Sequence, residues 1–94
     1  MVIHKLKIPD ELVILIRKMH PLLKKKIRIA FETIIDNPES GKALREELEG
    51  LNSYRVGTFR VIYRISEKNI IEIIAIGPRK NIYHETYRIV SREN

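Results

Sequence analysis

The side chains in this sequence that are best suited to chemistry are basic, and they gather in two short stretches. The stretch YRVGTFRVIYR carries Arg55, Arg60 and Arg64, and the later stretch GPRKNIYHE carries Arg79 and Lys80. An arginine fork matches two oxygens of a phosphate, and lysine supplies a compact positive charge. These residue types predict a site for a phosphate or a similar anion.

The first stretch alternates like a β-hairpin, and its turn sets the register. Gly57-Thr58 has glycine first, which is typical of a two-residue type II′ turn. Val56 then pairs with Phe59, and Arg55 pairs with Arg60. Paired side chains of adjacent strands have β-carbons about 4.5–5.5 Å apart, so two arginines there destabilise the sheet. An anion bridging both guanidiniums would compensate, although splaying into water or pairing with carboxylates is the structural alternative.

Arg64 has a simpler interpretation. The next strand places Glu72 opposite it, which predicts a cross-strand ion pair. We therefore assign Arg64 to the fold and not to the site.

Tyr83 and His84 follow the second basic stretch. A phenol can stack on a base or transfer a proton, and an imidazole titrates near neutral pH. The alternatives are that Tyr83 anchors the tail to the core and that His84 is inert. His4, His20 and His84 lack the spacing of metal ligands, and the chain has no cysteine. The sequence therefore predicts neither a metal nor a cofactor.

Size and charge limit the class of protein. Ninety-four residues predict a single domain over residues 1–94. The net charge of +6 favours an anionic partner such as nucleic acid or an acidic protein. The N-terminus lacks the features of a signal peptide, and the apolar runs are too short to cross a bilayer. These features predict a cytoplasmic protein without a membrane partner.

The N-terminal half reads as a strand followed by two helices. A strand is expected over residues 2–8, and a helix follows with Asp10 as its N-cap. Apolar residues with helical spacing predict a second helix after Pro21, which ends at Asn37. A polar loop with one or two helical turns then leads to Gly50.

The C-terminal half reads as three antiparallel strands, expected at residues 53–56, 59–66 and 69–77, with a tail helix over 81–90. One face of the hairpin is expected to be core: Tyr54, Val56, Phe59, Val61, Tyr63 and Ile65. Because helices and strands are segregated, we predict an α+β fold with the helices on one face of a mainly antiparallel sheet.

The order of these motifs resembles the RelE/ParE superfamily of type II toxin–antitoxin toxins. The matching segments are YRVGTFRVIYRI (54–65), IIEIIAIG (70–77) and GPRKNIY (77–83). The resemblance spans essentially the whole chain, because the preceding helical hairpin with its Asn-Pro end also fits. It implies a RelE-like fold and a cognate antitoxin partner of the RelB type, through which the complex could contact operator DNA.

The resemblance also implies an activity and roles for individual residues. RelE-like toxins are metal-independent endoribonucleases that cleave mRNA in the ribosomal A site, with the 2′-hydroxyl attacking the adjacent phosphate. Arg60 matches the arginine that contacts this phosphate, and Arg79 and Tyr83 match the other catalytic positions. Arg55 is expected to bind substrate, with Lys80 and His84 as further candidates.

The sequence departs from the family pattern at two places. The hairpin is short, and Ser53 stands where many relatives have a second basic residue. Pro78 occupies a position where histidine or a basic residue is common.

Two other functions are compatible with the same residues. ParE-like members poison DNA gyrase and do not cut RNA. A third possibility is a non-catalytic module that uses its basic face to bind an antitoxin or DNA. The retained Arg60, Arg79 and Tyr83 favour RNA cleavage.

Overall fold

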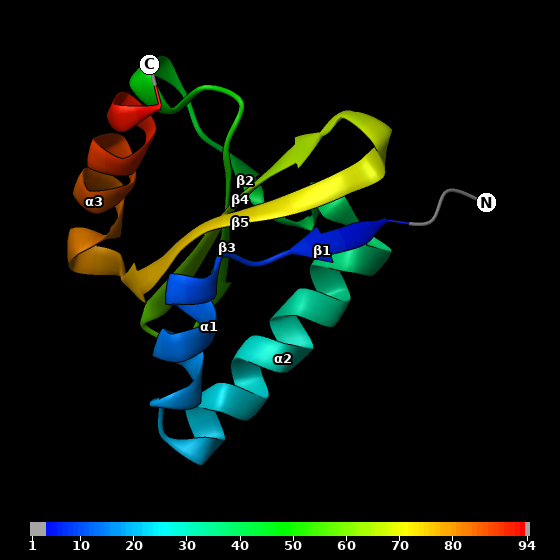
Figure 1. The fold of residues 1–94 in the computed structure, drawn as a ribbon, viewed down its shortest axis with the longest axis vertical. Coiled ribbons are helices and arrows are strands. Elements are labelled where there is room, and N and C mark those ends of the chain that lie inside the picture. The colour runs from blue at the N-terminus through cyan, green and yellow to red at the C-terminus, as the bar shows by residue number, and fades with distance from the viewer. Residues whose placement is uncertain (1–3, 94) are drawn as a thin grey trace.

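Three helices and five strands follow one another in the computed structural model, which describes residues 4–93 (Figure 1). In chain order they are β1 (Lys5–Lys7), α1 (Asp10–Arg17), α2 (Pro21–Asp36), β2 (Lys42–Ala43), β3 (Asn52–Val56), β4 (Phe59–Ser66), β5 (Ile70–Pro78) and α3 (Arg79–Arg92). Short 3₁₀ turns cover residues 38–40, 46–48 and 67–69. The predicted α+β class is confirmed.

The helix starts differ from those expected. The predicted cap at Asp10 is wrong: Pro9 is the N-cap, it makes no side-chain cap bond, and Asp10 already lies in the first helical turn. A carboxylate there still favours the positive end of the helix. In α2, Pro21 is the first helical residue, and Nδ1 of His20 accepts a hydrogen bond from the Leu22 amide at 3.1 Å.

Within residues 4–93 the strands form one sheet in the order β1-β5-β4-β3-β2. The predicted antiparallel meander of β3, β4 and β5 is confirmed. The first strand is shorter than expected, Lys5–Lys7, and pairs with β5 in parallel; residues 2 and 3 of that prediction lie outside the described residues. The two-residue strand β2 extends the other edge, inside the segment that was predicted as a loop with helical turns.

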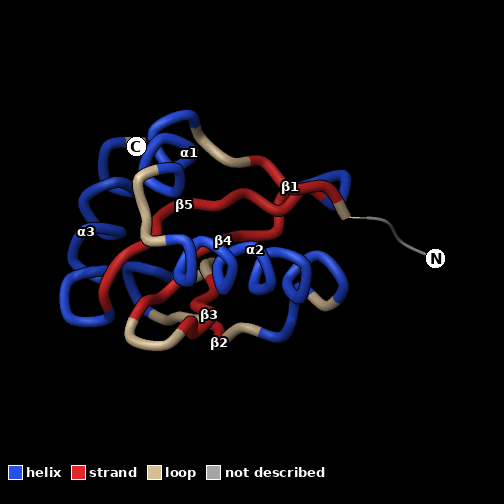
Figure 2. Tube along the Cα trace, turned by 90° about the horizontal axis from the view of Figure 1, so that it is seen from below, coloured by secondary structure: helices blue, strands red, loops and turns tan. Residues whose placement is uncertain are grey.

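The tail helix is longer than predicted and covers the second face of the sheet. It begins at Arg79, directly after β5, and packs Ile82 against Ile62 and Ala75. The α1–α2 hairpin instead covers the face that carries Val61 and Tyr63. In Figure 1, α3 is separated from the α1–α2 hairpin. In Figure 2, which is turned by 90°, α3 and α2 are again separate. The sheet is therefore covered by helices on both faces, and the prediction of helices on one face is wrong for α3, because the chain turns after β5 onto the face that α1 and α2 leave open.

The core face of the hairpin follows the predicted alternation up to its end. Val56, Val61 and Tyr63 are buried, but Ile65 is 44% exposed because it lies beside the β4–β5 turn at the margin of the sheet. A bulge between Ile62 and Tyr63 in the pairing of β4 with β5 also shifts the register by one residue.

Tyr63 ties the loop that follows α2 to the core. Its fully buried phenol donates to the Pro38 carbonyl at 2.6 Å and accepts from the Gly41 amide at 3.0 Å. A β-carbon at Gly41 would lie 2.5 Å from the Tyr63 hydroxyl oxygen, so the loop can approach this closely only with glycine. Burial raises the pKa of Tyr63 above its usual value, against the smaller lowering effects of its hydrogen bonds.

Candidate functional site

The hairpin turn and the first turn of α3 meet at one end of the molecule. The Arg79 amide, at the start of α3, donates to the Thr58 carbonyl in the turn at 2.9 Å. Gly57 has a φ of 61°, whereas Thr58 is not among the described residues with positive φ. A type II′ turn requires this combination, because only its first central residue has a positive φ. Glycine adopts this conformation without steric cost, so the predicted turn positions the two basic stretches side by side.

A basic cleft of about 600 Å³ lies between them, lined by Arg55, Gly57, Thr58, Pro78, Arg79, Lys80 and Tyr83. Four of the six predicted site residues are therefore brought together. Three of these four are cations, and none of the described carboxylates lines the cleft. The 14-residue α3 begins at its rim, so the positive end of the helix dipole adds to the field. This arrangement attracts phosphate groups.

Arg60 stands beside the cleft but is not among its lining residues. It pairs with Arg55 on one side and with Gly77 on the other, which confirms the predicted register. Its side chain is partly buried, and within residues 4–93 its buried Nε atom has no hydrogen-bond partner. Burying an unpartnered polar group of a cation costs free energy, which an anion accepting from the guanidinium would offset.

Arg55 is exposed and is held toward the turn. Its Nε donates to the Gly57 carbonyl at 3.3 Å, which leaves the outer nitrogens of the guanidinium free of any described hydrogen bond. Within the described residues neither Arg55 nor Arg60 forms an ion pair. The two arginines are thus opposed, as predicted, without a carboxylate between them.

Arg64 is engaged elsewhere. It contacts Glu72 at 3.3 Å, which confirms the predicted pair, and also Glu93 at the end of α3 at 3.1 Å. Burial lowers its pKa, but hydrogen bonds and charge from the two carboxylates outweigh burial, so its pKa is raised. Arg64 therefore links α3 to the sheet.

Tyr83 and His84 have different surroundings. Tyr83 is partly buried in the wall of the basic cleft, and its hydroxyl lies 3.2 Å from the Ser53 hydroxyl on β3. His84 is exposed on α3 and is not among the lining residues. The geometry brings Tyr83 to the cations and leaves His84 outside the cleft.

Two residues at this site were not among the predicted site residues. Thr58 supplies the carbonyl that holds α3, and Ser53 supplies the hydroxyl that holds Tyr83. No local sequence pattern identifies either residue, because each forms its hydrogen bond with a residue more than 20 positions later in the chain. A β-carbon on Gly77 would lie 3.2 Å from the Ile82 side chain, so this glycine also allows α3 to pack closely on β5.

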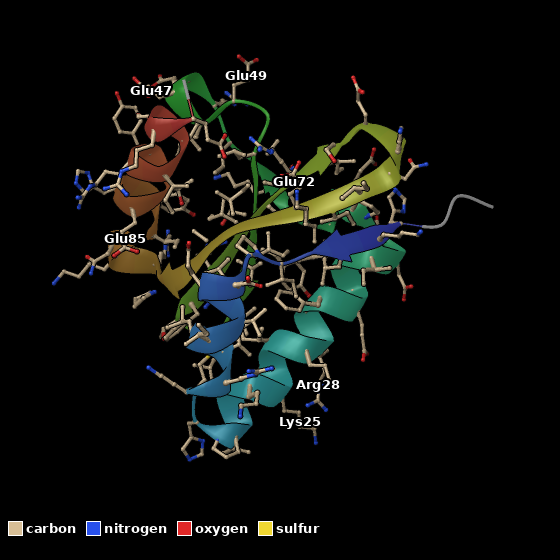
Figure 3. The ribbon with its side chains drawn as sticks, in the orientation of Figure 1. Lys25, Arg28, Glu47, Glu49, Glu72 and Glu85 are labelled. Atoms are coloured by element: carbon tan, nitrogen blue, oxygen red, sulfur yellow. The ribbon has the colours of Figure 1, made fainter. Side chains whose placement is uncertain are left out.

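A second hollow, of about 360 Å³, lies between α1 and α3. Its lining includes four carboxylates, of which Glu72 and Glu85 are labelled in Figure 3. An acidic lining repels phosphate, so this hollow does not compete with the basic cleft for such a ligand.

Positive charge is also present far from the cleft. Lys25 and Arg28 are exposed on α2, and Figure 3 shows both pointing away from the sheet. Among residues 4–93 no group of three or more histidine or acidic side chains is arranged to hold a metal ion. None of the helices in that range has the length and apolar composition needed to cross a membrane.

The family model described as "ParE toxin of type II toxin-antitoxin system, parDE" matches residues 7–83. The chain belongs to this toxin family. This agrees with the resemblance inferred from the hairpin and tail motifs, and with the α+β architecture around the basic cleft.

Known toxins of Mycobacterium tuberculosis show a likeness to this chain as well. The chain is 41% identical over 59 residues to Toxin RelE of Mycobacterium tuberculosis, an alignment that spans 61% of either protein and so less than two thirds of that relative. Toxin RelG of the same organism is 35% identical over 71 residues, which cover 72% of this chain and 82% of RelG. The crystal structure of the toxin–antitoxin complex RelBE2 from M. tuberculosis superposes with a TM-score of 0.71 at 28% identity, over 83% of this chain and 100% of that one.

Proposed function

We propose that this protein is the toxin of a toxin–antitoxin pair and that it inhibits translation by cutting mRNA on the ribosome. The observation that carries the proposal is the basic cleft, where Arg55, Arg79 and Lys80 converge and where no carboxylate of residues 4–93 is part of the lining. The similarity to Toxin RelE and Toxin RelG supports the same assignment.

In the proposed reaction the cleft binds the phosphate that follows the attacking ribose. The 2′-oxygen forms a bond to phosphorus while its proton passes to solvent. The P–O5′ bond breaks, its electron pair stays on the 5′-oxygen, and that oxygen takes up a proton. The products are a 2′,3′-cyclic phosphate and a 5′-hydroxyl, so the atoms balance without a co-reactant.

The side chains have distinct roles in this scheme. Arg55, Arg79 and Lys80 hold the RNA backbone in the cleft. Arg60, which stands beside the cleft, stabilises with its guanidinium the charge that develops on the phosphate oxygens. Tyr83 lines the cleft and carries a hydroxyl that can give its proton to the leaving 5′-oxygen.

A cognate antitoxin is the proposed protein partner. The superposed relative was crystallised as a complex of toxin with antitoxin, which supports an equivalent partner for this chain. An antitoxin that covers the basic cleft would block access of RNA.

Primer extension on translated mRNA tests the activity. Arg60→Ala should lower the cleavage rate by about 100-fold or more, as expected for losing one donor to developing charge. Arg28→Ala is the matched control, because it removes one exposed arginine from α2 and should leave cleavage unchanged. Undiminished cleavage by a folded Arg60→Ala variant would refute the assigned site.

Gyrase poisoning is the second candidate, because the matching family model is that of ParE toxins. A gyrase-mediated DNA cleavage assay with the same variants separates the two. If the unmodified protein traps gyrase on DNA and leaves translated mRNA intact, the ParE-like function replaces the ribonuclease. If it does neither, the basic face serves only for binding.

A further inference from the structure

Ser53 and Tyr83 form a hydrogen-bonded pair at the inner wall of the basic cleft. Ser53 lies on β3, and Tyr83 lies 30 residues later on α3, with 3.2 Å between their hydroxyl oxygens. Either hydroxyl could donate by distance alone. The direction of this bond decides whether the proton of Tyr83 is available to a ligand.

Burial decides which hydroxyl donates. Ser53 is 2% exposed, so solvent does not offer its proton an acceptor. Within residues 4–93 the Tyr83 oxygen is the only hydrogen-bond partner of the Ser53 side chain. A buried hydroxyl that fails to donate loses free energy. Ser53 therefore donates, and the Tyr83 oxygen accepts.

The proton of Tyr83 is then left for the cleft. The three charged side chains that line the cleft, Arg55, Arg79 and Lys80, are donors without acceptor capacity. None of them can accept from Tyr83. An oxygen of a bound phosphodiester is an acceptor, and it is the kind of ligand that the three cations attract.

We propose that Ser53 is a positioning residue that orients the Tyr83 hydroxyl as a donor to the leaving 5′-oxygen of bound RNA. This inference rests on the proposed ribonuclease function. As the P–O5′ bond breaks, the proton of Tyr83 moves to that oxygen, and the resulting phenolate is stabilised by the hydrogen bond from Ser53. Solvent then returns a proton to Tyr83. Ser53 does not touch the RNA.

Threonine and valine at position 53 make the matched pair for the test, because they have nearly the same shape and differ in the hydroxyl. Single-turnover cleavage of mRNA on programmed ribosomes should be about 10-fold slower for Ser53→Val than for Ser53→Thr, with similar half-saturating protein concentrations. The melting temperature of each variant establishes that it is folded.

A double-mutant cycle separates positioning from a structural effect. In the Tyr83→Phe background the difference between Ser53→Val and Ser53→Thr should disappear, because no phenol is left to orient. A 10-fold difference that persists in that background would overturn the proposal, and so would equal rates of the two variants with Tyr83 present.

A spectroscopic readout keeps the inference testable if the chain does not cut RNA. The ¹³Cζ resonance of Tyr83 reports the hydrogen bonding of its phenol, and among the four tyrosines it is identified by its loss in Tyr83→Phe. Ser53→Val should shift this resonance, and Ser53→Thr should not. No shift in either variant refutes the bond from Ser53. A shift without cleavage by the unmodified protein refutes the ribonuclease proposal, and with it the catalytic use of Tyr83.

Discussion

Replacing Arg60 by methionine is expected to raise the stability of the protein while it removes the proposed activity. Arg60 lies partly buried in the middle of the sheet, opposite another arginine. Its buried Nε has no partner among the described residues. Methionine keeps an unbranched apolar stem of similar length and carries no charge.

The size of the gain follows from two terms. Relieving a buried unpartnered polar atom returns about 1–3 kcal/mol. Removing the repulsion across the Arg55–Arg60 pair adds about 0.2–1 kcal/mol. Lost packing of the arginine stem offsets part of this, so we expect a net gain of about 1–3 kcal/mol. In a domain of this size that raises the melting temperature by about 5–20 °C.

Thermal unfolding of purified protein, with and without inorganic phosphate, measures this effect. Phosphate should stabilise the unmodified protein by mass action and stabilise Arg60→Met much less. Arg55→Met is the control, because it relieves the same repulsion from an exposed position and should change the free energy of unfolding by about 1 kcal/mol at most.

Two results would contradict this reasoning. A melting temperature of Arg60→Met at or below that of the unmodified protein would mean that the guanidinium does not destabilise the fold. An equal rise for Arg55→Met and Arg60→Met would assign the whole effect to charge repulsion, and none of it to the buried Nε.

Three further substitutions test the loop and the turn that frame the fold. Tyr63→Phe should destabilise the protein by about 1–3 kcal/mol in denaturant unfolding, because two backbone groups of the 38–41 loop lose their partner. The folded-state pKa of Tyr63 is raised, so the stability that this group contributes is complete below about pH 10 and falls at higher pH. Tyr63→Phe should therefore reduce the loss of stability at alkaline pH, as measured by the melting temperature over a pH series. Gly41→Ala should also destabilise, and less so in the Tyr63→Phe background, where the 2.5 Å contact with the hydroxyl is gone; purely additive losses would refute that contact. Gly57→Ala should cost about 1–2 kcal/mol by strain at a φ of 61°, and an unchanged melting temperature would argue against the turn.

In the proposed reaction, the basic cleft would compensate for the small number of conventional acid–base residues. Cations and a helix N-terminus supply electrostatic stabilisation, which is often the largest single contribution to catalysis. The opposed pair of arginines lowers the stability of the fold, which is a form of the trade-off between stability and activity. Because Arg60 is partly buried in the sheet, its position is set by the strand pairing and needs no carboxylate partner.

Much of the hairpin could be predicted from the sequence because it depends on local rules. The Gly57-Thr58 turn and the alternation of apolar residues define the register, which places Arg55 opposite Arg60. The same counting predicts the pair of Arg64 with Glu72 across the next turn. Each inference needs only the period of a strand and the preferences of a short turn.

What only the tertiary structure decided is the path of the chain after Pro78. Helical spacing predicts a tail helix but does not say which face of the sheet it covers, because that depends on the direction in which β5 ends and on the space left by α1 and α2. Packing of α3 on the second face buries Ser53 and brings Tyr83 against it. No local pattern links two residues 30 positions apart, so the hydroxyl pair behind the cleft becomes visible only in the folded protein.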